Sequence, residues 1–392
     1  MEKTAAQAYA AHIESFAVSF RYPVDFTRDA FDPENQILVS ACNACGEPGP
    51  FNILFFLDSG VADKHPTLPE RINAYCAARP DVFTRAGDIV IVPGGEQIKQ
   101  DRKHLFSAIE KMATARLCRH SFVAVVGGGS VLDVVGLAAS LVHRGLRLIR
   151  LPSTVLAQSD AGVGVKNGMD DQGMKNFLGV FAPPFAVIND FTLLSTLDDE
   201  NWVGGLSEAF KVAIIKDHDF FSWLSRNAEG LGRRDMIAME EAVHRTAVLH
   251  LRHIAGGGDP FEFGTARPLD FGHWSAHRLE TLSGYSIGHG QAVSMGIALD
   301  TVYAQKKGLI RESERDQILA ALSRTGLPVY CGLMARREPT GELSLCRGLR
   351  DFQEHLGGEL CITLPRGIGD KVEVHEMDLF AVEEAVAFLA GQ

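Results

Sequence analysis

An alternation of short apolar runs and helical patterns constrains the fold of this chain more than any other feature. Each apolar run ends at a turn, and most are separated from the next by an amphipathic helical pattern. Such an alternation is typical of a parallel, doubly wound sheet. We therefore predict an α/β fold with a mainly parallel, Rossmann-like sheet. Its strands are predicted at 53–57, 89–92, 122–126, 146–151 and 183–190, with further short strands at 16–20 and 37–39.

The strand patterns stop near residue 197, where we place a domain boundary. Helical patterns dominate from there to about 325, and only a short strand and a closing helix follow. The sequence thus predicts two domains. Residues 1–197 are expected to form the α/β domain with an N-terminal extension, and residues 198–392 an all-helical domain.

Composition excludes several functional classes. The chain has 392 residues and a formal net charge of −11, which argues against bulk binding to nucleic acid or to an anionic membrane. No apolar run approaches membrane-spanning length, and the N-terminus lacks an apolar signal core, so we expect a cytoplasmic protein. Seven scattered cysteines do not suggest a disulfide framework, and Cys42 and Cys45 are interpreted as reduced thiols.

Three histidines form the most specific chemical pattern. His273 and His277 are four residues apart, which on a helix stacks both imidazoles on one face. His289 follows after a short polar break, at the start of another helical pattern. Imidazoles that converge in this way, with a carboxylate, suit a divalent metal such as zinc. The alternative is that they are partly buried polar residues without a ligand.

A glycine turn follows the strand predicted at 122–126. Ligands of doubly wound sheets bind beyond the carboxyl ends of the strands, where Asp58, Glu96 and the glycines at 127–129 are all expected. The turn opens a helix whose N-terminus could face a pyrophosphate, with Asp133 in its first turn. The Gly-x-Gly-x-x-Gly fingerprint is absent, so a tight turn without a ligand is an equal alternative.

With these residues in hand, the chain resembles the dehydroquinate synthase superfamily, the sugar phosphate cyclases, from about 54 to about 310. Residues 93–99 look like the family's nucleotide-contacting Pro-x-Gly-Glu-x-x-Lys, 127–133 like its glycine turn and Asp, and 152–160 like its Pro-Thr-Thr-Leu-Leu-Ala-x-x-Asp. The resemblance implies NAD as a cofactor. The residues that it assigns to the cofactor are Asp58, Glu96, Lys99, Gly128, Gly129, Ser130, Asp133, Ser153, Thr154, Asp160 and Lys175.

The resemblance also implies a ligand set and a catalytic set. Residues 205–211 look like the family's Gly-x-Ala-Glu-x-x-Lys, which makes Glu208 the carboxylate ligand of a metal held with His273 and His289. His277 becomes a substrate or proton-transfer residue, and the metal is expected to be zinc, with cobalt as an alternative. Arg144 would reach the phosphate in a neighbouring subunit, so a homodimer is expected. The other implied substrate contacts are Lys166, Lys175, Asn176, Lys211, Arg252, Arg267 and Asp270.

The implied reaction uses NAD catalytically. A hydride leaves a ring hydroxyl carbon whose oxygen the metal polarises, and the new ketone acidifies the neighbouring C–H. Phosphate is then eliminated, the ketone is reduced back, and the ring opens and recloses as a carbocycle by an aldol step. The expected partner is therefore a small sugar phosphate.

Departures from the family pattern cluster in the substrate residues. Asp270 stands where dehydroquinate synthases have Asn, Arg252 where they have Lys, and Ala266 where they have Arg, with Arg267 one place later. Asp370 replaces a late Lys. An extra carboxylate disfavours a keto-carboxylate substrate, so sedoheptulose 7-phosphate or a related sugar phosphate is predicted instead.

Within the superfamily, the run from Arg267 to Trp274 and the long N-terminal segment resemble a branch that is encoded in bacterial ebo-type clusters. Three alternative functions remain open. Dehydroquinate synthase proper remains possible if the carboxylate contacts are rearranged. An NAD-dependent polyol dehydrogenase of the iron or zinc type would share the glycine turn and metal-binding helices. A sugar-phosphate-binding protein without turnover would bind neither metal nor nucleotide.

Overall fold

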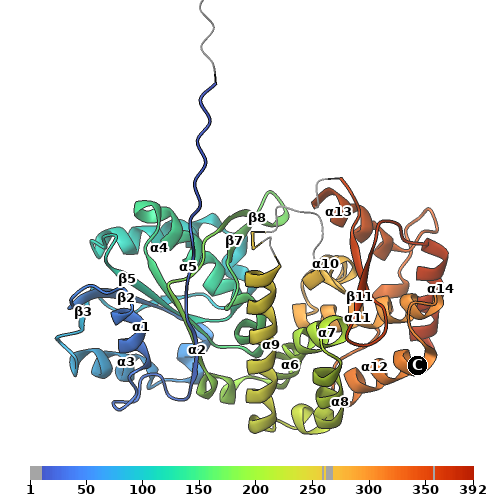
Figure 1. Cartoon of the computed structure of the whole chain (residues 1–392), viewed down its shortest axis with the longest axis horizontal. Coiled ribbons are helices and arrows are strands. Elements are labelled where there is room, and N and C mark those ends of the chain that lie inside the picture. The colour runs from blue at the N-terminus through green and yellow to red at the C-terminus, as the bar shows by residue number, and fades with distance from the viewer. Residues whose placement is uncertain (1–10, 258–259, 262–267, 356–357) are drawn as a thin grey trace, which may run out of the picture.

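A computed structural model describes residues 11–257, 260–261, 268–355 and 358–392 of the chain. Figure 1 shows a sheet with its covering helices beside a group of helices, with α9 (Met236–Gly256) between the two parts. The predicted α/β architecture with a helical C-terminal part is therefore confirmed. The change from sheet to helices falls between β9, which ends at Asp190, and α6, which begins at Asp199.

The main sheet has seven strands, and every pairing within it is parallel. Their order is β1-β9-β6-β5-β2-β3, and the short β4 pairs with the second half of β2. Since all strands run the same way, their carboxyl ends meet at one edge of the sheet. The strands are β1 (Val24–Thr27), β2 (Phe51–Asp58), β3 (Phe83–Arg85), β4 (Val90–Val92), β5 (Phe122–Gly127), β6 (Arg147–Pro152) and β9 (Ala186–Asp190).

Side chains of β2 alternate between two hydrophobic layers. Ile53, Phe55 and Leu57 pack with residues of α1 (Ile37–Asn43) and α3 (Leu68–Ala77). Leu54 and Phe56 pack with residues of α4 (Arg102–Thr114) and α5 (Gly129–Leu141) on the other face. The period of two that places side chains on alternate faces of a strand explains why this central run is apolar throughout.

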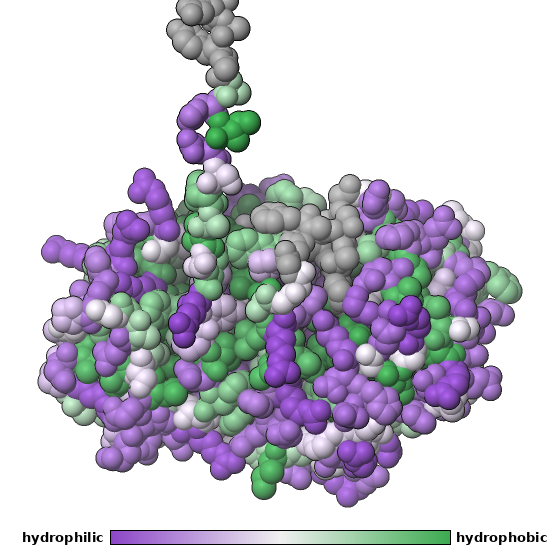
Figure 2. Space-filling model, in the orientation of Figure 1, coloured by the Kyte–Doolittle hydropathy of each residue, from purple (hydrophilic) through white to green (hydrophobic). Residues whose placement is uncertain are grey.

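Two predicted strands were wrong. Residues 37–39 begin helix α1, whose buried Leu38, Ala41 and Cys42 follow helical spacing, and a run of three residues is too short to reveal its period. Residues 16–20 form no strand. Phe16 is 88% exposed there, and Figure 2 shows the N-terminal segment rising clear of the body. The edge strand of the sheet is instead β1, a few residues later.

Two helical stretches of the structure are each divided. Residues 96–114 form a 3-10 turn, η1 (Glu96–Gln100), followed by α4, which Asp101 caps by accepting from the amide of Lys103. Residues 199–216 form α6 (Asp199–Gly204) and α7 (Leu206–Lys216). Gly205 lies between them, and a side chain there would overlap Val155.

A hairpin and a π-helical turn fill the stretch that the sequence left as a hairpin or long loop. The turn η3 (Ala157–Ala161) follows β6, and β7 (Lys166–Asp171) pairs antiparallel with β8 (Met174–Phe181). The guanidinium of Arg150 is fully buried beneath this stretch. It donates to the carbonyls of Gly162, Gly164 and Lys166, which fixes the path of the chain into the hairpin.

The helical part has its own hydrophobic core, in which α11 (His289–Lys306) is buried along most of its length. Val187 of β9 and Ala247 of α9 pack together where this part meets the edge of the sheet. No helix among the described residues is both long and apolar enough to cross a membrane. The remaining α-helices and strands of the helical part are α8 (His218–Gly232), α10 (His273–Leu282), α12 (Glu312–Thr325), α13 (Arg347–His355), α14 (Leu379–Ala390) and the antiparallel pair β10 (Ile362–Pro365) and β11 (Lys371–Val374).

Candidate functional site

Three loops meet beyond the carboxyl ends of β2, β4 and β5. Asp58 ends β2, caps α2 (Ser59–Lys64) by accepting from the amide of Gly60 at 2.8 Å, and lies 3.5 Å from the amide nitrogen of Gly128. A side chain at Gly94 would overlap the carboxylate of Asp58. Burial raises the pKa of Asp58. The predicted meeting of Asp58, the loop after β4 and the glycine turn is therefore present.

The glycine turn leads into a helix whose N-terminus is not capped by a side chain. Gly128 is the N-cap of α5, and Gly129 and Ser130 begin its first turn. A side chain at Gly129 would come within 3.3 Å of Ala161, so the start of the helix approaches η3 closely. Uncapped amides of a first helical turn are suited to an anion.

Lys99 forms the centre of a second polar group. Its ammonium lies 2.6 Å from Oδ2 of Asp133 and donates to Oδ1 of Asn176 at 2.8 Å. Burial alone would lower the pKa of Lys99, but the carboxylates of Asp133 and Glu96 raise it. Oε2 of Glu96 is buried and accepts no hydrogen bond within the described chain. The structure thus brings together four of the residues that the resemblance assigned to cofactor and substrate.

Two hydroxyl residues follow β6. Ser153 is buried, and the hydroxyl of Thr154 accepts from the amide of Ala157, which starts the π-helical turn. The turn places Asp160 over α9, where its Oδ1 lies 2.7 Å from Nδ1 of His250. Sequence reasoning missed His250, because nothing in the pattern of α9 distinguishes it from a core histidine.

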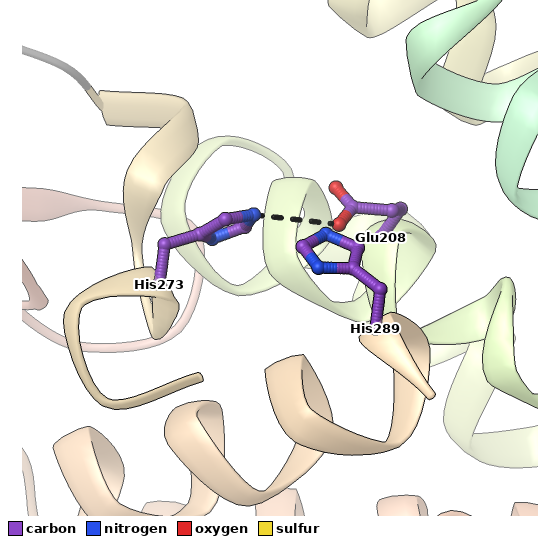
Figure 3. A group of neighbouring side chains, drawn as sticks. All are labelled: Glu208, His273 and His289. Atoms are coloured by element: carbon purple, nitrogen blue, oxygen red, sulfur yellow. Dashed lines mark ion pairs between the residues drawn. The ribbon is translucent and has the colours of Figure 1, made fainter. Parts of the chain in front are cut away.

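Glu208, His273 and His289 converge from three helices. Glu208 lies in the first turn of α7, and the two histidines are the first residues of α10 and α11. One potential ligand atom from each lies within 4.8 Å of the others, and Nε2 of His273 is 3.8 Å from Oε1 of Glu208 (Figure 3). Glu208 is 1% exposed, and its Oε1 accepts no hydrogen bond from any described residue.

The ring of His273 is held in one orientation. Its Nδ1 lies 3.1 Å from the carbonyl oxygen of Phe271, which favours a proton on Nδ1 and leaves Nε2 to face Glu208. Gly272 adopts a φ of +79° to make this turn, and Asp300 accepts from its amide and from the indole of Trp274. Burial and the charge of Lys211 lower the pKa of His273, so its ring stays neutral.

Lys211 lies one turn after Glu208 and forms a buried ion pair with Oε2 of that carboxylate. Burial alone would lower the pKa of Lys211, but Glu208 and Asp160 raise it, with a smaller effect of Asp270. The pKa of Asp160 is in turn well below its usual value: burial would raise it, but Lys211 and His250 outweigh that effect. Lys211 thus favours negative charge on both carboxylates. For Glu208 this effect does not outweigh burial, which raises the pKa of that carboxyl.

Glu280 is a second residue that sequence reasoning missed. It lies seven residues after His273, a spacing of two helical turns that would have placed it on the same face of α10. Its Oε1 is 2.8 Å from Nζ of Lys175 and 3.4 Å from Nδ1 of His289. Burial would raise the pKa of Glu280, but His289 and Lys175 lower it to about 2.

His277 lies beside the three-residue group and not within it. Its ring centroid is 5.5 Å from that of His273 and 6.0 Å from that of His289, and the residue is exposed. With Glu280 and His289 it forms a second group whose ligand atoms lie within 4.8 Å of one another. The role in contact with a substrate that the resemblance implies for His277 stays a prediction.

Other predicted residues lie apart from this cluster. Arg144 follows the far end of α5, a helix about 20 Å long that begins at the glycine turn, and it lines a hollow of about 240 Å³ with Phe20 and Phe181. Lys166 and Arg252 are exposed. Asp370 pairs with Arg366 on the surface. Arg267 and Ala266 fall outside the described residues.

Comparison with known proteins places these features in a family. Residues 89–204 match the 3-dehydroquinate synthase N-terminal family, and residues 205–343 match the 3-dehydroquinate synthase C-terminal family. A 2-epi-valiolone synthase of Actinosynnema mirum is 35% identical over 273 residues, which are 69% of each chain. A 3-dehydroquinate synthase of Xylella fastidiosa is 32% identical over 85% of this chain and 88% of its own.

Solved structures agree with these matches. A 2-epi-5-epi-valiolone synthase of Streptomyces hygroscopicus, solved with NAD⁺ and Zn²⁺ bound, superposes with a TM-score of 0.85 at 28% identity, covering 97% of this chain and 99% of its own. A 2-deoxy-scyllo-inosose synthase, solved with carbaglucose-6-phosphate, NAD⁺ and Co²⁺, gives a TM-score of 0.73 at 20% identity, covering 93% and 95%, and so shows a shared fold.

Proposed function

This chain belongs to the 3-dehydroquinate synthase family and is a sugar phosphate cyclase; from that premise we propose that it binds NAD and a divalent metal and cyclises a seven-carbon sugar phosphate without a carboxylate, such as sedoheptulose 7-phosphate. The observation that carries the proposal is the convergence of Glu208, His273 and His289 beside the buried ammonium of Lys211. We further propose that residues 1–197 bind NAD and that residues 198–392 bind the metal and substrate.

The three converging side chains fit a divalent metal. Oε1 of Glu208 is a buried carboxylate oxygen without a hydrogen-bond donor in the described chain, a costly arrangement unless a cation lies against it. His273 is neutral and presents Nε2. One carboxylate and two imidazoles leave coordination positions open for a substrate, as in catalytic zinc sites. A metal held there supplies the Lewis acidity that polarises a substrate hydroxyl.

The glycine turn and its neighbours fit NAD. The first turn of α5 offers uncapped amides to a pyrophosphate, and Glu96 offers a buried carboxylate oxygen without a donor in the described residues. Asp58 lies against Gly128 at the same place, and Lys99 and Asp133 close the group. NAD held there supplies a transient hydride acceptor. The NAD⁺ bound to the similar 2-epi-5-epi-valiolone synthase supports this assignment.

Lys211 and Lys175 have the chemistry to handle a phosphorylated polyol. Each is a cation paired with a buried carboxylate, Lys211 with Glu208 and Lys175 with Glu280, so each ammonium is held in place. The carboxylate of Glu208 also raises the pKa of Lys211. Such preorganised donors stabilise oxyanions that form on a substrate. His277, on the exposed side of the histidine group, is placed to move a proton between substrate and solvent.

The carboxylate of Asp270 supports the proposed substrate class. Asp270 lies close enough to Lys211 to raise its pKa, so it adds negative charge where the family's dehydroquinate synthases have a neutral Asn. A substrate carboxylate brought to this region would meet that charge at an energetic cost. Sedoheptulose 7-phosphate has no carboxylate, and the similarity to two valiolone synthases supports this class of substrate.

Dehydroquinate synthase proper is the second candidate. It is favoured by the 3-dehydroquinate synthases of Xylella fastidiosa, which match a larger share of this chain than the valiolone synthase of Actinosynnema mirum does. In that case the exposed Arg252 would have to turn into the site and neutralise Asp270. A polyol dehydrogenase would instead accumulate NADH, because its cofactor is consumed stoichiometrically.

Phosphate release tests the proposal. Purified protein, loaded with Zn²⁺ or Co²⁺ and a catalytic amount of NAD, is offered sedoheptulose 7-phosphate and 3-deoxy-arabino-heptulosonate 7-phosphate separately. We expect release from the first alone, with no net NADH, and none from Glu208→Gln protein. The matched control is Glu229→Gln, which removes an exposed carboxylate paired with Arg233. Release from the second substrate alone would make the protein a dehydroquinate synthase, and stoichiometric NADH without phosphate would make it a dehydrogenase.

A further inference from the structure

Glu280 is a buried carboxylate that connects two parts of the site. It is 2% exposed and projects from α10 between β8 and the start of α11. Its Oε1 is shared by Nζ of Lys175 at 2.8 Å and Nδ1 of His289 at 3.4 Å. No motif of the family resemblance singled it out. A buried carboxylate is costly to keep, so its retention here between two functional residues requires a reason.

We propose that Glu280 is the positioning residue of the metal ligand His289, and that it joins this ligand to the hairpin β7–β8 through Lys175. The inference rests on the proposed function, because it presumes that Glu208, His273 and His289 hold a divalent cation. The inference adds Glu280, which lies outside that ligand set. It also predicts that Lys175, whose ammonium pairs with Glu280, affects the affinity for the metal.

The two ring nitrogens of His289 have different surroundings. Because Nδ1 faces the carboxylate of Glu280, a proton on Nδ1 is favoured, and Nε2 keeps the lone pair that a metal needs. His273 is oriented in the same way by a different acceptor, the carbonyl oxygen of Phe271. Both imidazoles therefore present Nε2, one held by a backbone oxygen and the other by a carboxylate. Such outer partners raise the basicity of the ligand and fix its ring.

Lys175 connects Glu280 to the hairpin β7–β8. Its ammonium lies over the ring of Tyr285 at 5.4 Å and against the same oxygen of Glu280 that His289 uses. The hairpin carries Lys175 and Asn176, and Asn176 accepts from Lys99 in the cofactor group. A shift of the hairpin would thus move Lys175 and change how strongly the Glu280 carboxylate interacts with Nδ1 of His289. The hairpin is in this way coupled to the geometry of the metal ligands.

A competing reading makes Glu280 a ligand itself. His277, Glu280 and His289 also bring ligand atoms within 4.8 Å of one another, so they could hold a second cation. The two readings differ in stoichiometry. A positioning residue changes the affinity for one cation per chain, whereas a ligand of a second site changes the number bound.

Cobalt binding to the full-length chain tests the inference. Protein stripped with a chelator is titrated with Co²⁺ against a competing chelator, and the visible spectrum of the bound Co²⁺ reports the ligand geometry. The variants are Glu280→Ala, Glu280→Gln and Lys175→Met. The control is Glu338→Gln, which removes a carboxylate that pairs with Arg278 of the same helix at 3.8 Å, outside the cluster.

We expect Glu280→Ala to bind Co²⁺ about 10- to 100-fold more weakly with an altered spectrum. Glu280→Gln keeps an acceptor for Nδ1–H and should recover most of the affinity. Lys175→Met should show a smaller loss, and Glu338→Gln none. Thermal unfolding of the apo-proteins separates these effects from general destabilisation. If Glu280 had only a structural role, its replacement would lower the unfolding temperature, and Glu280→Gln would not restore the wild-type cobalt spectrum.

Three outcomes overturn the inference. Wild-type affinity and an unchanged spectrum in Glu280→Ala would show that His289 needs no partner. Two cobalt ions per wild-type chain and one in Glu280→Gln would make Glu280 a ligand. If wild-type protein binds no Co²⁺ or Zn²⁺ at all, the proposed function fails together with the inference, whereas binding that is indifferent to Glu280 overturns the inference alone.

Discussion

Nδ1 of His250 lies 2.7 Å from Oδ1 of Asp160, which ties helix α9 to the π-helical turn that follows β6. Both side chains are largely buried, and the charge of Lys211 also lowers the pKa of Asp160. The pair therefore joins the sheet to the helical part at the point where the predicted cofactor and metal residues approach each other.

Replacing His250 with Phe should destabilise the protein by about 2 kcal/mol at pH 7, because the Asp160 carboxylate loses a buried donor. The folded-state pKa of Asp160 is depressed, so this stabilisation is present above the unfolded pKa and disappears as the pH falls through the folded one. Urea unfolding at pH 7 measures the difference. His244→Phe, at an exposed position of the same helix, is the control, and equal stability of both variants would contradict the prediction.

Replacing Asp270 with Asn should shift substrate preference. The change removes the charge that disfavours a substrate carboxylate and restores the residue typical of dehydroquinate synthases, so kcat/KM for the heptulosonate should rise relative to sedoheptulose 7-phosphate by roughly tenfold. The ratio of the two kcat/KM values is the measurement. The control is Asp370→Asn, which removes an exposed carboxylate that pairs with Arg366. A ratio that is unchanged in Asp270→Asn would remove our reason for preferring a substrate without a carboxylate.

Arg144 should act in a neighbouring subunit, since it lies at the far end of α5 from the glycine turn. Arg144→Ala and Lys211→Ala chains should each be inactive alone. Mixed one to one and allowed to exchange, they should regain about a quarter of wild-type phosphate release, because half of the dimers then contain one intact site. Lack of recovery in mixed dimers would place Arg144 in its own subunit's site or outside catalysis.

Asp300 should make stability depend on pH near neutrality. Burial raises its pKa to about 7, although Trp274 and Gly272 donate to it. A carboxyl whose folded pKa exceeds the unfolded value stabilises the fold at low pH, and that contribution is lost as the pH rises from about 4 towards 7. Asp300→Asn does not titrate, so its stability relative to wild type should rise over this interval by up to about 4 kcal/mol. Urea unfolding at pH 5, 6, 7 and 8 gives the slope; parallel curves for the two proteins would contradict it.

Local patterns were sufficient to predict most of the sheet, and the motifs of the family resemblance named three residues, Glu208, His273 and His289, that the structure brings together. The strand at 53–57 is apolar on both faces and ends at Asp58, and this pattern is typical of a central parallel strand. His273 and His289 begin helices that the sequence pattern predicts, whereas the helix that contains Glu208 begins later than its pattern suggests. Such features depend on residues that are close in sequence, so periodicity and motif spacing reveal them.

Contacts between distant segments were not predictable in the same way. The pairing of His250 with Asp160 depends on how α9 crosses the end of β6, and that of Glu280 with Lys175 depends on where the hairpin lies. Residues 16–20 show the opposite error. Their alternating apolar side chains match a strand, but no neighbouring strand pairs with them among the described residues. An alternating pattern shows that a segment could form a strand, but it does not show whether another strand is available to pair with it.

Helix dipoles give the arrangement of the three ligands a further consequence. His273 and His289 begin their helices and Glu208 lies in a first turn, so three positive helix ends lie near the proposed metal position, each equivalent to roughly half a unit charge. These dipoles oppose the binding of the cation, and the buried carboxylates of Glu208 and Glu280 offset them. The same dipoles favour negative charge on a substrate oxygen that approaches the cation. On the proposed function, the helix ends would therefore weaken the affinity for the metal and would favour negative charge on a substrate oxygen.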